Sequence, residues 1–217
     1  MIQFFKDAVE FVPILFEGAK LSIQVMIGSL LFSTVLGMIW ALMRVSKYRV
    51  LVWFSGAMIN ILRGIPIIVL LFYIYFVMPD VGISLPAIHA AIIGLGLAYS
   101  AYQAENFRAG IEAIDRGQME AAMAMGMSWT MMMRRVILPQ AIKIILPPYG
   151  NIMIMMLKDS SQASTITVAE LALQGKLIAT SNFKNATVFT LVALMYLVMC
   201  VPLIMLVRHL EKRNAAK

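Results

Sequence analysis

The pattern of apolar and polar residues divides the chain into long apolar stretches joined by polar segments. The first stretch, Leu21–Met43, carries no charged residue. A helix of this length rises about 1.5 Å per residue and crosses a hydrocarbon core of about 30 Å. Similar stretches recur, and we predict five transmembrane helices over about residues 21–43, 50–78, 85–107, 138–158 and 186–207.

The second stretch is interrupted by Arg63-Gly64, and Pro66 follows at once. Proline removes a backbone donor and clashes with the preceding turn, so it kinks or ends a helix. Backbone groups freed in this way are tolerated at membrane depth only where they face protein or water. We therefore expect one span that kinks or unwinds at this point.

The segment before the first stretch has a different pattern. Over residues 1–20, phenylalanines alternate with lysines and acidic residues. This pattern is typical of an amphipathic helix at a membrane surface. We therefore expect residues 1–20 to form an outer segment that lies on the external face.

Composition supports a membrane protein. Hydrophobic residues make up 61% of the 217 residues and charged residues 13%, whereas a soluble domain carries about 25% charged residues. No polar segment is long enough to bury a core of its own, so residues 1–217 are expected to form a single all-α integral membrane domain. The single cysteine, Cys200, excludes an intramolecular disulfide.

The formal charge of +7 is better explained by the positive-inside bias than by nucleic-acid binding. Twelve of the 18 lysines and arginines lie in the first loop, between the third and fourth stretches, and in the C-terminal tail. We therefore place the N-terminus outside and the C-terminus in the cytoplasm. The stretch 108–143 is then cytoplasmic, and 158–185 is external.

The segment from Glu120 to Gln140 is helical in character but rich in apolar side chains for a cytoplasmic region. Asp115 can cap its first helix, and Gly126 divides it into two short pieces. An apolar patch exposed to water indicates a partner surface, and methionine adapts well to a groove. We interpret the segment as a helical arm that docks into a groove on another protein.

The residues of this arm resemble the EAA loop of ABC-transporter permeases. That loop has Glu-Ala-Ala, then glycine, then an Ile-x-Leu-Pro run; here these are Glu120, Ala121, Ala122, Gly126 and Val136–Pro139. Flanking runs are similar to the polar amino acid uptake permeases of bacteria: LRGIP, AYQAENFRAGI, LPPYGN and LKDSS. The resemblance covers roughly residues 59–165, and valine replaces the usual isoleucine at position 136.

The resemblance implies a coupling loop at 113–137 in the cytoplasm, with these residues transmitting motion from an ATPase: Glu120, Ala121, Ala122, Gly126, Leu138 and Pro139. It also implies the partners of a bacterial inner-membrane importer. These are a dimer of cytoplasmic ATP-binding subunits, a second permease subunit (a copy or a paralogue) and an extracytoplasmic substrate-binding protein. The chain has no G-x-x-x-x-G-K-[ST] run, so we expect no cofactor of its own and ATP on the partner ATPase.

Charged residues inside spans are functional hypotheses. Arg63 can bind a substrate carboxylate through two parallel hydrogen bonds. The alternative is that it forms a structural ion pair with an acidic residue. Glu105 suits a substrate ammonium, or else pairs with Arg108 on the same helix face. Asp159 resembles a substrate-contacting position of these permeases, with an N-cap as the alternative. The expected substrate-binding set is Asn60, Arg63, Ser100, Tyr102, Glu105, Asp159 and Gln162.

Other classes of function fit less well. The apolar stretches hold no paired nucleophile and base and no metal-ligand cluster, so we do not expect an enzyme. A self-standing channel or carrier would not need the cytoplasmic arm. Among importer substrates, polar amino acids lead, with an opine, a compatible solute or another amino-acid derivative as the alternative.

Overall fold

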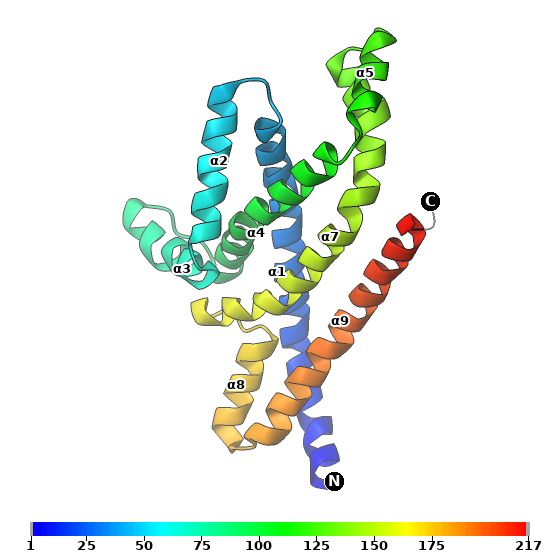
Figure 1. Ribbon diagram of the computed structural model, residues 1–217. Coiled ribbons are helices and arrows are strands. Elements are labelled where there is room, and N and C mark those ends of the chain that lie inside the picture. The colour runs from blue at the N-terminus through cyan, green and yellow to red at the C-terminus, as the bar shows by residue number, and fades with distance from the viewer. Residues whose placement is uncertain (1, 216–217) are drawn as a thin grey trace.

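The computed structural model describes residues 2–215, and over these residues the chain is helical without strands (Figure 1). Short 3₁₀ and π-helical turns join or extend the α-helices. The α-helices are α1 (Ile2–Arg44), α2 (Arg49–Gly64), α3 (Ile67–Phe72), α4 (Ala87–Glu112), α5 (Arg116–Ala124), α6 (Trp129–Met132), α7 (Leu138–Asp159), α8 (Leu171–Asn182) and α9 (Asn185–Ala215).

The first twenty residues do not form a separate segment, contrary to the expectation from their pattern. Helix α1 runs unbroken from Ile2 to Arg44, through Pro13. Phe11, Leu15 and Ala19 are buried in a cluster with residues of α8 and α9. Protein therefore covers one side of this segment, while Phe5, Val9 and Phe16 remain exposed. The amphipathic pattern alone does not show whether lipid or protein covers its apolar residues.

The predicted break in the second span is confirmed. Helix α2 ends at Gly64, Ile65 is extended, and Pro66 precedes α3. The two helical parts, Arg49–Gly64 and Ile67–Val81, are bent by 99°. The second part continues through a π-helical turn, Tyr73–Val77, and a 3₁₀ turn, Met78–Val81.

Three helical segments of the described chain are long and apolar enough to cross a membrane: Phe4–Arg44, Trp129–Ile166 and Asn185–Lys212. The bent pair counts as a fourth if it forms one span. Helix α4 is long enough to cross a membrane but less apolar than those three segments. Of its 26 residues, 14 are buried. Because α4 packs against α1, α2 and α7, its polar residues Tyr99, Ser100 and Gln103 are buried in protein.

Helices α1 and α4 approach so closely that small residues are required between them. A Cβ added at Gly37 would lie 2.9 Å from the backbone oxygen of Ser100 and 2.7 Å from the Cβ of Gln103. A backbone carbonyl cannot move aside as a side chain can. Any larger residue at position 37 would therefore push the two helices apart.

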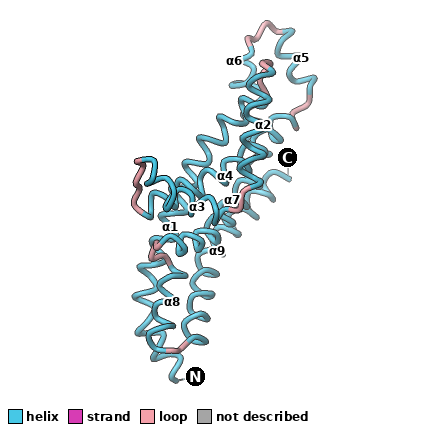
Figure 2. Tube along the Cα trace, turned by 90° about the vertical axis from the view of Figure 1, so that its left-hand side faces the viewer, coloured by secondary structure: helices cyan, strands magenta, loops and turns pink. Residues whose placement is uncertain are grey.

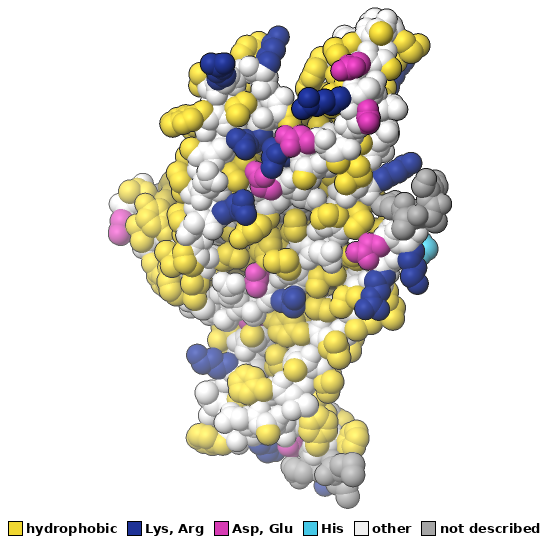
Figure 3. Space-filling view, in the orientation of Figure 1, with side chains coloured by type: hydrophobic (Ala, Val, Ile, Leu, Met, Phe, Trp, Pro, Cys, Tyr) yellow, Lys and Arg dark blue, Asp and Glu magenta, His cyan; other side chains and the backbone are white. Residues whose placement is uncertain are grey.

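The two ends of the molecule differ in structure (Figures 1 and 2). At one end, α5 and α6 project beyond the other helices, joined by a turn in which Gly126 has a φ of 76°. At the other end, the N-terminal part of α1 lies beside α8 and the start of α9, where Lys184 forms a 2.7 Å ion pair with Asp7. Figure 3 shows apolar side chains across the middle, with most of the visible lysines and arginines nearer the α5 end.

A buried carboxylate fixes the α8 end. Glu170 caps α8 by accepting from the backbone N–H groups of Ala172 and Leu173, each at 2.9 Å. Its carboxylate also accepts from the hydroxyls of Ser22 in α1 at 3.1 Å and Tyr196 in α9 at 2.9 Å. Burial raises the pKa of the Glu170 carboxyl, and these four hydrogen bonds oppose that rise. One side chain therefore joins three helices.

Candidate functional site

A row of polar side chains connects the end of α2, the middle of α4 and the end of α7. The hydroxyl of Tyr99 donates to the carboxylate of Asp159, the last residue of α7, at 2.6 Å. The rings of Tyr99 and Tyr102 are 5.8 Å apart, and the guanidinium of Arg63 lies 5.6 Å from the centre of the Tyr102 ring. We call Arg63, Tyr102, Tyr99 and Asp159 the polar row.

The positions in this row follow from the local structure. Arg63 lies in the last turn of α2, just before the break at Pro66, and is exposed. Tyr99 and Tyr102 are three residues apart on α4, so they share one face. Tyr99 is buried with 1% of its surface exposed, whereas Tyr102 is 40% exposed. The row therefore runs from a half-buried carboxylate to an exposed guanidinium.

The chemistry of the row is that of a site for a zwitterion. Arginine holds a carboxylate through two parallel N–H donors. Asp159 at the other end can accept from an ammonium group, and Tyr99 holds its carboxylate in place. The exposed face of Tyr102 between them offers an aromatic surface to an aliphatic or cationic side chain.

Other predicted substrate residues lie elsewhere. Ser100 is fully buried, and its hydroxyl donates to the backbone oxygen of Leu97 in its own helix at 2.7 Å. Glu105 forms an ion pair with Arg108 at 2.5 Å, the structural alternative that the sequence left open. Arg108 also pairs with Glu112. These side chains are therefore engaged within α4.

Asn60 and Gln162 are not joined to the row by any hydrogen bond seen in the described part of the chain. Asn60 is exposed one turn before Arg63 and lines a cavity beside α2. Gln162 lies in the 3₁₀ turn Ser160–Ile166 that follows Asp159 and is half-buried. Asp159 makes no side-chain cap to that turn, so the N-cap alternative for this residue is not supported.

Tyr99 was not among the predicted substrate residues. A tyrosine within an apolar helix has one hydroxyl to satisfy, and that requirement was the available signal. Its partner lies 60 residues away on another helix. A local sequence pattern does not predict a contact between residues so far apart in the chain.

The projecting arm has an exposed outer surface and a buried base. The predicted cap is present, because the Asp115 side chain accepts from the N–H of Gly117 at 2.6 Å. Glu120 and Ala121 are exposed, whereas Ala122 is buried in a cluster with Phe107 of α4. The outer surface is rich in apolar side chains, with exposed fractions of 56% for Met123, 79% for Met125, 57% for Trp129 and 42% for Met131.

The arm joins α7 without a stop at Pro139. A π-helical turn, Met133–Ile137, leads directly into α7, and Pro139 lies in its first turn. Proline is tolerated there because the first N–H groups of a helix have no partner within it. Leu138 is half-buried and packs against the same cluster as Ala122. The arm and α7 are therefore joined without a break and share one apolar cluster.

Comparison with known proteins identifies the family. The sequence profile of the family described as "Binding-protein-dependent transport system inner membrane component" matches residues 33–215. The probable amino-acid ABC transporter permease protein YckA of Bacillus subtilis strain 168 is 39% identical, with 97% of this chain and 93% of that protein covered. The probable glutamine ABC transporter permease protein GlnM of the same strain is 39% identical over 83% and 84% of the two chains.

Solved structures agree. A chain in the crystal structure of an amino acid ABC transporter with histidines is 35% identical and superposes with a TM-score of 0.89, over 96% of this chain and 98% of that one. The profile match, the curated relatives and this superposition each extend over most of the chain. It therefore belongs to the binding-protein-dependent transport system inner membrane components and is a multi-pass permease of an ABC importer rather than an enzyme.

Proposed function

We propose that this permease carries polar amino acids or related zwitterions and that the polar row is its substrate site. The observation that carries the proposal is the alignment of Arg63 at the end of α2, Tyr102 and Tyr99 in the middle of α4, and Asp159 at the end of α7. An amino acid presents a carboxylate and an ammonium group, and the two ends of the row match these charges. The relatives named for amino acids, and for glutamine in particular, support this substrate class.

Five spans fit the helices best. They are α1, the bent pair α2–α3, α4, α7 and α9. Helix α4 qualifies by its length and its place among α1, α2 and α7, which shields Tyr99, Ser100 and Gln103 from lipid. With the basic loops in the cytoplasm, the N-terminus and α8 are external and the C-terminus is cytoplasmic.

The arm formed by α5 and α6 acts as the coupling element. Its exposed methionines and Trp129 suit a groove on a cytoplasmic ATPase subunit. Glu120, Ala121 and Gly126 shape the docking end, while Ala122, Leu138 and Pro139 connect it to α7. Since α7 ends at Asp159, a movement of the arm on ATP binding would be transmitted to one end of the polar row.

The remaining partners follow from this role. ATP binds to a dimer of ATPase subunits, and this chain contributes no cofactor. A second permease subunit, a copy or a paralogue, completes the pathway. An extracytoplasmic binding protein delivers the substrate to the external face. A substrate derived from an amino acid, such as an opine or a compatible solute, would use the same two charges.

Uptake by the complete transporter in proteoliposomes tests the proposal. Radiolabelled polar amino acids are offered with the binding protein outside and ATP inside. We expect ATP-dependent uptake that Asp159→Asn lowers at least tenfold, with Asp80→Asn as the control because Asp80 is an exposed acid outside the row. Equal uptake by the two variants would refute the site, and uptake without ATP would refute the coupling.

A further inference from the structure

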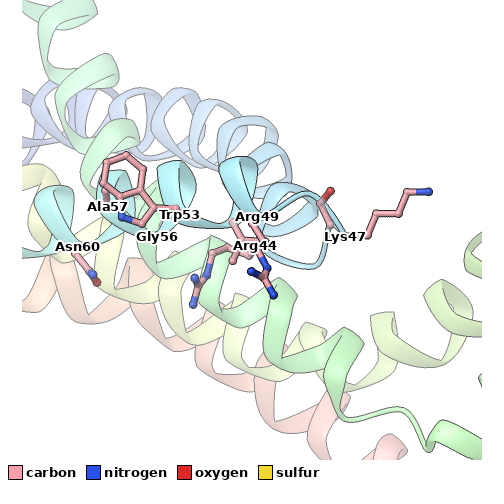
Figure 4. A pocket seen from close by; sticks show the side chains of 9 residues that line it. Arg44, Lys47, Arg49, Trp53, Gly56, Ala57 and Asn60 are labelled. Carbon is pink, nitrogen blue, oxygen red and sulfur yellow. The ribbon is translucent and has the colours of Figure 1, made fainter.

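A basic cavity lies between the end of α1, the loop that follows it and α2 (Figure 4). Its volume is about 590 Å³, and it is lined by Arg44, Ser46, Lys47, Arg49, Val52, Trp53, Gly56, Ala57 and Asn60. Three of these side chains are cationic and none is acidic. The polar row does not use this cavity, apart from the neighbouring position of Asn60.

The cations of the cavity lack acidic partners. The salt bridges found among the described residues use Lys20, Arg108 and Lys184 as cations, and none uses Arg44, Lys47 or Arg49. The Nε of Arg44 is buried and has no hydrogen-bond partner within the described chain. Figure 4 shows the guanidinium groups of Arg44 and Arg49 directed the same way, whereas Lys47 points outward. Two guanidiniums that share a cavity repel each other unless an anion lies between or beside them.

Gly56 makes room for one of these groups. A Cβ added at Gly56 would lie 3.0 Å from a terminal nitrogen of Arg44. The guanidinium of Arg44 therefore lies across the surface of α2 at a position without a side chain. This arrangement holds a planar donor in place, and such donors match the oxygens of a phosphate.

The surface next to the cavity is apolar. Val50 is 76% exposed and Trp53 74% exposed, with Phe54 at 42% on the same helix. A water-soluble anion would gain nothing from these side chains. A lipid would gain from them, because tryptophan prefers the level of the lipid headgroups. Apolar residues deeper in the membrane contact the acyl chains.

We propose that this cavity binds the phosphate of an anionic phospholipid, held by Arg44 and Arg49, with the lipid chains along the exposed side of α2. The inference rests on the orientation given under the proposed function, which places the cavity at the cytoplasmic leaflet, where anionic lipids attract basic segments. Free phosphate offers the same anionic group, so the test separates the two sources.

The test uses the complete transporter, purified with its ATPase in detergent. Phosphatidylglycerol or phosphatidylcholine is titrated in, and native mass spectrometry counts the lipids retained. We expect selective retention of phosphatidylglycerol that weakens at least about thirtyfold in Arg44→Gln/Arg49→Gln, since these two guanidiniums would hold the phosphate directly by charge-assisted hydrogen bonds. The matched control, Arg208→Gln/Lys212→Gln, removes two cations from α9 outside the cavity and should stay within about twofold of wild type.

A second variant keeps all charges. Gly56→Leu fills the space occupied by Arg44 and should also lose phosphatidylglycerol selectivity, while amino-acid binding stays as in wild type. Equal retention by the cavity variants and the control overturns the proposal. Displacement of the lipid by inorganic phosphate alone overturns it in favour of a soluble anion. If the wild-type protein retains phosphatidylglycerol selectively but binds no amino acid, the proposed function is refuted and the lipid site is not.

Discussion

At the scale of single residues, the structure assigns different roles to side chains that look alike in the sequence. Tyr99 and Tyr102 both lie in α4, but the first is buried against Asp159 and the second is exposed beneath Arg63. Glu105 is paired within its helix, whereas Glu170 joins three helices. The role of each side chain is therefore indicated by its burial and its contacts more than by its residue type.

Tyr99→Phe should weaken amino-acid binding by about tenfold, because a hydrogen bond to a charged group contributes about 1.5–3 kcal/mol. The ring still fills its site, so the thermal midpoint should change little. Calorimetric titration of the purified transporter measures the affinity. Tyr73→Phe serves as the control because Tyr73 is 55% exposed. An unchanged affinity in Tyr99→Phe would mean that Asp159 does not need this bond.

Glu170→Gln should lower the thermal midpoint by about 5–10 °C, because an amide cannot accept all four bonds and leaves buried donors unpaired. Thermal unfolding of the detergent-solubilised protein gives the midpoint. Glu10→Gln, in the exposed part of α1, makes the same chemical change and should have no measurable effect. Equal midpoints for the two variants would show that the Glu170 network does not stabilise the fold.

Gln103→Leu should leave the thermal midpoint unchanged or raise it. Gln103 is fully buried, and neither its amide nitrogen nor its oxygen has a partner within the described chain. An apolar residue of similar shape removes the cost of burying those atoms. A clear loss of stability would instead indicate that water or a partner subunit satisfies this amide in the assembled transporter.

At the scale of elements, close helix contacts and the projecting arm carry different functions. Gly37 lets α1 and α4 approach to backbone contact. The arm, by contrast, makes its contacts at its base and leaves its outer surface free. The glycine sets the distance between two helices, and we propose that the arm binds the ATPase subunit.

Gly37→Val should lower the thermal midpoint by about 5 °C, since overpacking costs about 1–3 kcal/mol. Gly64→Ala is the matched control, because a Cβ at that position meets nothing within 4 Å. Thermal unfolding of both variants gives the comparison. Equal midpoints would mean that α1 and α4 can separate at little cost.

Met125→Glu should lower ATP-driven uptake by tenfold or more while leaving amino-acid binding intact, because it places a charge on the apolar docking surface of the arm. His209→Glu adds a charge to an exposed position on α9 away from the arm and should transport as wild type. Co-purification of the ATPase with each variant gives a second measurement. Normal uptake by Met125→Glu would exclude the arm as the coupling element.

At the scale of the whole molecule, hydropathy was a reliable guide to where the long helices lie. The five predicted stretches correspond in sequence to α1, the α2–α3 pair, α4, α7 and α9, and the break at Pro66 is where the sequence placed it. The extent of α1 was not predictable, because an amphipathic pattern does not reveal whether lipid or protein covers it. Arg63, Tyr102 and Asp159 were among the predicted substrate residues, but the bond from Tyr99 to Asp159 and the Glu170 network were missed because they join residues distant in the chain.

The most direct test of the account is calorimetric titration of the purified transporter, without its binding protein, against a panel of polar amino acids. Wild type, Asp159→Asn, Arg63→Gln and the Asp80→Asn control are measured in parallel. We predict that one amino acid binds wild type and the control, and that each polar-row variant binds it at least tenfold more weakly. Equal affinity in all four proteins would place the substrate site outside this polar row.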